Sequence, residues 1–189
     1  TLEKATSIHP DEPWKGQYLR LLLWLASDTG RRIGSILALR WSDWNPDEGS
    51  NGVLRWRADS DKVGREWWAP VTPDVRRELE AFRRLHPGVG EKLLFASAID
   101  PQRPLHRATV TGWLKKAERL AGLPKLVRGS FHPYRRLWAS ERKHLPLKDV
   151  AAAGGWTDTS TLLRCYQTPD VETMERVVSE PRRIRRIAQ

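Results

Sequence analysis

The stretch around which this sequence is organised is residues 29–43, TGRRIGSILALRWSD. Gly30 ends the helix that apolar spacing predicts over residues 14–27, because glycine commonly stands just past a helix end. A second helix follows, and its buried stripe is expected to hold Ile33, Ile36, Leu37 and Trp41. Arg32 falls in the first turn of that helix, where a cation opposes the helix dipole. Arg32 is therefore a candidate ligand for an anion, with a simply solvated arginine as the alternative.

Outward from this stretch, the sequence predicts a mostly α-helical chain with one small antiparallel β-hairpin. Alternation and turn residues indicate strands at residues 53–57 and 66–71, joined by a turn at 62–65. Helical spacing and helix breakers indicate further helices at residues 73–86, 107–121, 132–144, 146–154, 160–167 and 171–179. We expect three parts along the chain: a loose lead-in or the end of a linker at 1–13, one domain at 14–179 and a basic tail at 180–189.

The composition predicts an anionic partner. The chain has 189 residues and a formal net charge of +10, and arginine supplies 24 of its 33 basic residues. Such a balance is typical of nucleic-acid binding, although membrane surfaces and acidic proteins attract the same charge. The single cysteine, Cys165, excludes an internal disulfide and fits a reducing cytoplasm. The longest apolar run, residues 21–26, is too short to span a bilayer.

A second candidate anion site lies in the predicted helix that begins at residue 132. His132 and Arg135 share one face of that helix because they are three residues apart. Histidine can act as a general acid or base near neutral pH, and arginine adds a fixed positive charge. This pattern is common by chance when it stands alone. The remaining histidines and the acidic residues lack metal-ligand spacing, so no metal site is expected.

Three further residues carry weaker signals. Trp156 follows two glycines and could present its indole N–H as a donor, or could be an ordinary core tryptophan. Tyr166 could be a nucleophile if cations or a base help to remove its proton, or could simply pack on a helix face. Lys62, in the predicted hairpin turn, could reach a phosphate or a leaving oxygen, or could be solvated.

Taken in order, these residues resemble the catalytic set of the tyrosine recombinase (phage integrase) family. The segments that carry the resemblance are TGRR at 29–32 with LRWSD at 39–43, KVGR at 62–65, HPYR at 132–135, PLKDV at 146–150, GW at 155–156 and TLLRCY at 161–166. The resemblance covers about residues 14–170. It implies that family's catalytic-domain fold, an α+β arrangement that is mostly helical with a small antiparallel sheet.

The resemblance also implies a reaction and its partners. A site-specific recombinase or integrase of this kind cleaves and rejoins DNA through a 3′-phosphotyrosine, without metal, ATP or another cofactor. The resemblance assigns six residues: Tyr166 as nucleophile, Arg32, Arg135 and Trp156 as ligands of the phosphate, His132 as acid–base group and Lys62 as proton donor to the leaving 5′-oxygen. The implied partner is double-stranded DNA in the cytoplasm at the nucleoid, away from any membrane. A homo-tetramer would act on paired sites, with a monomer as the alternative for the isolated domain.

The sequence departs from the family pattern at several positions. Ser35 stands where an acidic residue usually supports the first arginine, and Trp156 where histidine is more common. The spacing from Trp156 to Tyr166 is one residue longer than usual, so the common spacing would place Cys165 in the nucleophile position. The helical domain that usually precedes this one is missing, which predicts a catalytic domain taken from a longer recombinase. The alternatives are a type IB topoisomerase-like or telomere-resolving enzyme and an inactive DNA-binding module of the same fold.

Overall fold

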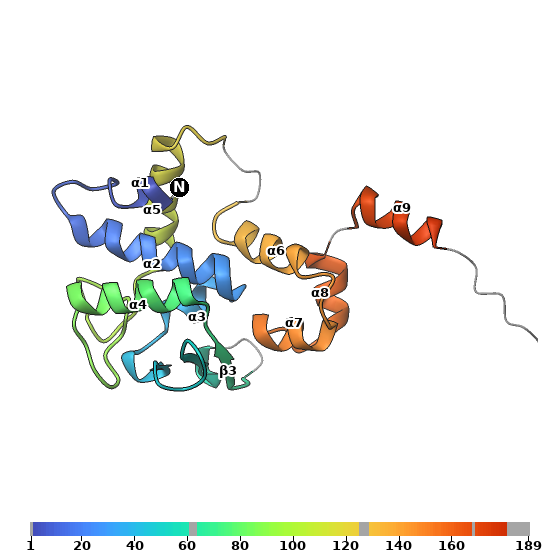
Figure 1. Ribbon diagram of the computed structural model, residues 1–189. Coiled ribbons are helices and arrows are strands. Elements are labelled where there is room, and N and C mark those ends of the chain that lie inside the picture. Colours follow the sequence, from blue (N-terminus) through green and yellow to red (C-terminus); the bar gives the residue numbers. More distant parts are fainter. Residues whose placement is uncertain (1, 61–63, 125–128, 168, 181–189) are drawn as a thin grey trace, which may run out of the picture.

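The structure is a computed structural model that describes residues 2–60, 64–124, 129–167 and 169–180 (Figure 1). Its α-helices are α1 (Leu2–Ala5), α2 (Pro13–Thr29), α3 (Ile33–Leu37), α4 (Pro73–Leu85), α5 (Arg107–Leu120), α6 (His132–Glu141), α7 (Leu147–Gly154), α8 (Thr159–Tyr166) and α9 (Val171–Ser179). Its strands are β1 (Trp44–Asn45), β2 (Val53–Trp56) and β3 (Trp67–Pro70). The predicted fold class, mostly α with a small antiparallel sheet, is confirmed.

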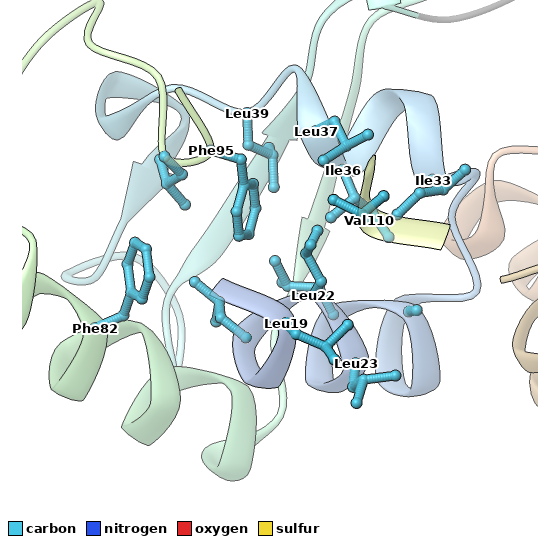
Figure 2. Close-up of a cluster of buried hydrophobic side chains, with 14 of the residues drawn as sticks. Leu19, Leu22, Leu23, Ile33, Ile36, Leu37, Leu39, Phe82, Phe95 and Val110 are labelled. Carbon is cyan, nitrogen blue, oxygen red and sulfur yellow. The ribbon is translucent and has the colours of Figure 1, made fainter. Parts of the chain in front are cut away.

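Helix α2 is the centre of the larger hydrophobic core. It packs against α4, α6, α3 and α5. Figure 1 shows α2 in the middle of these helices. Its predicted stripe, Leu19, Leu22, Leu23 and Ala26, is fully buried. Figure 2 shows Leu22 pointing toward Ile36 of α3, with Phe82, Phe95 and Val110 among the other members of the cluster. Burial of this apolar surface stabilises the α2–α3 pair, which carries the turn at residues 30–32.

That turn is held by close packing against α6. Gly30 ends α2 in the left-handed region at φ 62°, a conformation that glycine adopts without steric cost. A Cβ at Gly30 would lie 2.5 Å from the Trp138 ring, so a larger residue would collide with α6. The Trp138 indole also donates to the Asp28 carbonyl at 2.8 Å. The two contacts fix where Arg31 and Arg32 leave the helix.

The sheet has three antiparallel strands in the order β1-β2-β3. The predicted hairpin is present, with Leu54 opposite Ala69 and Trp56 opposite Trp67. The two-residue strand β1, which places Trp44 opposite Leu54, was not predicted because it is too short to show alternation. Residues 61–63, the first two of the predicted turn included, lie outside the described residues.

A second, smaller core joins α6, α7 and α8. Its buried members are Trp138, Ala139, Val150, Ala151, Trp156 and Leu162. Tyr166 packs at its edge and is only partly buried. Figure 1 shows these three helices grouped at one end of α2. The end of α8 is therefore held beside α6 by packing that is separate from the α2 core.

Two expectations about element bounds are corrected. Residues 2–13 are not a loose lead-in, because α1 packs on α5 and on α2, and Ala5 and Ile8 are fully buried. The segment is too short for its periodicity to be read, so its burial is decided by tertiary packing. The predicted second helix ends early: α3 stops at Leu37, and Trp41 is buried from a 3₁₀ turn, Trp41–Asp43.

Candidate active site

Arg135 is the most deeply buried charge of the site. It lies in the first turn of α6, and only 2% of its surface is exposed. Its Nη1 donates to the carbonyl of Gly154 at 2.6 Å and also to the carbonyl of Gly30. Its guanidinium lies 3.4 Å from the centre of the Trp156 ring. Arg135 therefore ties the turn after α2 to the end of α7 with one nitrogen.

The other nitrogens of Arg135 remain available for a ligand. Among the described residues, no hydrogen-bond acceptor serves Arg135 Nε, Arg135 Nη2 or the Trp156 indole nitrogen, although all three atoms are buried. Four other buried indoles share this property, so the Trp156 donor gains its significance from its place beside Arg135. A buried donor without a partner costs about 1–3 kcal/mol, and more when it is charged. An anion that accepted these bonds would remove that cost.

The electrostatics of Arg135 favour the same conclusion. Burial, and next the positive charge of Arg32, lower the pKa of Arg135 to about 9, while the neighbouring Tyr166 acts in the opposite direction. The guanidinium remains charged at neutral pH but is held in an unfavourable environment. A bound phosphate would supply the missing negative charge.

His132 lies one helical turn before Arg135 and is accessible from solvent. Its ring centre is 5.3 Å from that of Tyr166. Partial desolvation of the imidazole, followed by the charges of Arg136, Arg135, Arg107 and Arg32, lowers its pKa below the ordinary 6.5. At neutral pH the ring is therefore uncharged and can accept a proton.

Tyr166 is the last residue of α8 and meets the other candidates from the opposite side. Its ring lies 4.9 Å from Trp156, edge to face, and 5.4 Å from the Arg135 guanidinium. Its carbonyl accepts a hydrogen bond from Ser140 Oγ of α6 at 2.8 Å, which fixes the end of α8. The preceding residue, Cys165, is exposed.

A cleft of about 550 Å³ opens next to these residues. Among the described residues, its lining includes the basic side chains Arg31, Arg32, Arg107, His132 and Arg135 and one acidic side chain, Asp59. The structure thus brings together five of the six predicted residues, Arg32, His132, Arg135, Trp156 and Tyr166. The sixth, Lys62, lies outside the described residues.

Ser35, the residue in the usual acidic position, faces the predicted hairpin. Its hydroxyl donates to the Ser60 carbonyl at 2.9 Å, and both residues line the cleft. The bond connects α3, which follows Arg32, to the segment that leads into residues 61–63. Ser35 therefore takes up a backbone contact that links two walls of the cleft.

Sequence reasoning missed two arginines of this cleft. Arg107 occupies the first turn of α5, and the dipole argument that singled out Arg32 would have found it as well. Arg31 is 6% exposed and buried among aromatic rings, and nothing in its local sequence distinguishes it from a solvated neighbour of Arg32. The two carbonyls that accept its side-chain hydrogen bonds belong to residues more than 100 positions away.

Solved structures with the same fold define the class of protein. The XerA recombinase superposes with a TM-score of 0.70 at 16% identity, over 96% of this chain and 64% of its own. The XerH recombinase in a post-cleavage complex with its difH substrate superposes with a TM-score of 0.68 at 21% identity, over 95% of this chain and 51% of its own. A lambda integrase dimer bound to a core site superposes with a TM-score of 0.59 at 21% identity, over 90% of this chain and 49% of its own. The fold is that of a tyrosine recombinase catalytic domain.

The sequence profile described as "Phage integrase family" matches residues 8–172, and the chain belongs to that family. A search of curated proteins finds no match. The chain spans about half to two thirds of the length of the recombinases it resembles. None of the helices in the described segments is long and apolar enough to cross a bilayer.

Proposed function

We propose that this domain cleaves and rejoins DNA strands in site-specific recombination through a covalent 3′-phosphotyrosine. The observation that carries the proposal is Arg135, a buried guanidinium whose Nε and Nη2 have no hydrogen-bond acceptor within the described part of the chain, next to the Tyr166 ring and at the wall of a basic cleft. A DNA phosphate satisfies both requirements of this geometry, because it is anionic and accepts several hydrogen bonds. Family membership supports the same chemistry.

In the proposed reaction the Tyr166 hydroxyl oxygen bonds to phosphorus while the bond from phosphorus to the 5′-oxygen breaks. The phenolic proton passes to His132, whose ring is adjacent and neutral. Lys62 gives a proton to the departing 5′-oxygen. In the reverse step a 5′-hydroxyl attacks the phosphotyrosine, so the energy of the ester bond is kept and neither ATP nor a metal takes part.

Charge on the phosphate is stabilised by groups that are fixed before DNA binds. Arg135 donates through Nε and Nη2, the Trp156 indole donates beside it, and Arg32 approaches from the turn before α3. Donors that are already oriented are worth more than solvent, because they need no rearrangement as charge develops. Arg107, at the cleft wall, would bind DNA phosphate without taking part in bond exchange.

The proposed partners are double-stranded DNA and further copies of this chain, acting in the cytoplasm as a homo-tetramer on paired sites. Helix α9 supports assembly, because none of its residues is buried and it lies apart from the rest of the chain in Figure 1. Its exposed apolar residues are Val171, Met174, Val177 and Val178. Among the structural neighbours, lambda integrase is a dimer on its core site.

The test is to trap the covalent intermediate. A double-stranded DNA with a nick just 3′ to the scissile phosphate loses a short fragment on cleavage, so the protein–DNA adduct accumulates and survives denaturing electrophoresis. Incubation with fragmented genomic DNA, followed by sequencing of trapped DNA, would reveal the site. Adduct at one sequence supports a recombinase, and relaxation of supercoiled plasmid at no defined site would favour the topoisomerase-like alternative. Absence of adduct at every sequence would favour the alternative that the domain is an inactive DNA-binding module.

The pH dependence of adduct formation reports on His132. Because its pKa is lowered, the ring gains a proton only below its ordinary value of 6.5. We expect kcat/KM to be constant from about pH 8 down to about pH 6.5 and to fall below that, since this parameter follows the free enzyme. His132→Gln should remove this acidic limb and reduce the rate roughly 10²–10⁴-fold. His144→Gln, at an exposed histidine beyond α6, is the control and should leave the profile unchanged. A limb that persists in His132→Gln would reject His132 as the base.

A further inference from the structure

Arg31 is a buried arginine that connects three elements of the fold. Its Nε donates to the Ala153 carbonyl at 3.0 Å and its Nη2 to the Ala152 carbonyl at 3.1 Å, both in the last turn of α7. Its guanidinium lies 5.0 Å from the centre of the Trp56 ring in β2 and 6.0 Å from that of Trp67 in β3. One side chain thus joins the turn after α2, the end of α7 and the sheet.

The end of α7 is completed by two arginines. The last four carbonyls of a helix lack partners within it and carry a partial negative charge, which cations stabilise. The Ala151 carbonyl accepts from the backbone N–H of Trp156 at 2.8 Å. The Ala152 carbonyl accepts from the backbone N–H of Gly155 as well as from the Arg31 side chain. Ala153 accepts from Arg31, and Gly154 accepts from Arg135. Arg31 and Arg135 therefore hold neighbouring carbonyls of one helix end.

That helix end leads directly to Trp156. Gly155 has φ 71°, and a Cβ there would lie 2.2 Å from Arg31 Nη1, so the backbone closes tightly over the guanidinium. The indole of Trp156 in turn lies against both Arg135 and Tyr166. A shift of the last turn of α7 would move the Trp156 donor and the Gly154 carbonyl that anchors Arg135.

We propose that Arg31 is a positioning residue of the active site, which acts through Trp156 and Arg135 by fixing the end of α7 against the sheet. Two of its donor nitrogens are committed to carbonyls and the third is enclosed by Gly155. The inference rests on the proposed strand cleavage for its effect on rate, but its structural part concerns the free protein alone. A displacement of about 1 Å at reacting groups can cost about 10²-fold in rate.

The test combines a spectroscopic reading of Trp156 with cleavage and binding. The protein is labelled with 5-fluorotryptophan, and the ¹⁹F resonance of residue 156 is assigned from Trp156→Phe. In Arg31→Met, which keeps bulk but removes the donors, we expect this resonance to shift and adduct formation to slow roughly 10²-fold. The Kd for the DNA substrate should stay within about twofold. Arg31→Lys replaces the planar guanidinium with a compact ammonium, so its resonance shift and its adduct rate should lie between those of wild type and Arg31→Met.

Arg83→Met is the control, because Arg83 in α4 also lies over a tryptophan, Trp41, at 5.7 Å and is not among the described residues that line the cleft. It should leave the Trp156 resonance and the adduct rate unchanged. If Arg31→Met does not fold, the Trp156 resonance, the adduct rate and the Kd of Arg31→Lys test the proposal instead. An unmoved Trp156 resonance overturns the proposal, and so does DNA affinity that falls in step with the rate. If wild-type protein forms no adduct, a shifted resonance still supports the positioning role and only the reaction is rejected.

Discussion

Replacement of Tyr166 by phenylalanine is expected to abolish the covalent protein–DNA adduct while DNA affinity stays within about twofold. The change removes only the hydroxyl that would bond to phosphorus, and the ring can keep its contacts with Trp156 and His132. Loss of a nucleophile reduces rates by roughly 10⁴-fold or more, because the remaining groups stabilise a transition state that can no longer form. The measurement is adduct formation on the nicked DNA, alongside Kd from titration at fixed salt.

Cys165→Ala is the control for this experiment. Cys165 is the exposed neighbour that the usual spacing would place in the nucleophile position. Because Tyr166, whose ring lies against those of His132 and Trp156, is the proposed nucleophile, the variant should form adduct at the wild-type rate. Adduct that survives Tyr166→Phe and disappears in Cys165→Ala would reassign the nucleophile to the thiol.

Arg135→Lys is expected to have the second-largest effect, on both cleavage and stability. Lysine cannot replace the planar guanidinium, which binds two carbonyls through Nη1 and would offer Nε and Nη2 to the phosphate. Loss of preorganised donors costs about 10²–10³-fold each, so we expect adduct formation to slow by at least about 10³-fold. Loss of a hydrogen bond to a charged group should also lower the free energy of unfolding by about 2 kcal/mol.

Arg136→Lys is the matched control, one position along the same helix and exposed. It keeps its charge near His132, so we expect less than a threefold change in rate and an unchanged denaturation midpoint. Stability is measured by urea denaturation, and cleavage is measured well below the midpoint so that unfolding does not contribute. Cleavage by Arg135→Lys at the wild-type rate would show that Arg135 serves only to hold the fold.

Much of the fold was predictable because helices reveal themselves by local periodicity. The stripe of Leu19, Leu22 and Leu23 and the stop at Gly30 are properties of adjacent residues, and the structure confirms both. The same reasoning failed at β1, which has two residues, and at the segment before α2, where Ala5 and Ile8 are buried. Elements that short have no period, and only their tertiary neighbours decide where they lie.

The candidate site divides in the same way. Residue types and their order along the chain suggested Arg32, His132, Arg135, Trp156 and Tyr166 as candidates only through their combined resemblance to the tyrosine recombinase family, because each signal alone was weak. Their roles remain proposals. The order of residues could not reveal that Arg135 divides its nitrogens between backbone and cleft, because its carbonyl partners are contributed by two other segments of the chain.

Arg31 and Arg32 show most clearly where local information ends. They are adjacent in the sequence and chemically identical, and the sequence reasoning selected only Arg32. After the left-handed turn at Gly30, Arg31 binds the last turn of α7 and lies against Trp56 and Trp67, and both Arg31 and Arg32 line the cleft. Chain order alone predicted helices α2 to α9, the hairpin and the candidate residues of the site. That Arg31 is buried while Arg32 is only partly buried was decided by the packing of α7 and the sheet, because burial depends on residues distant in sequence.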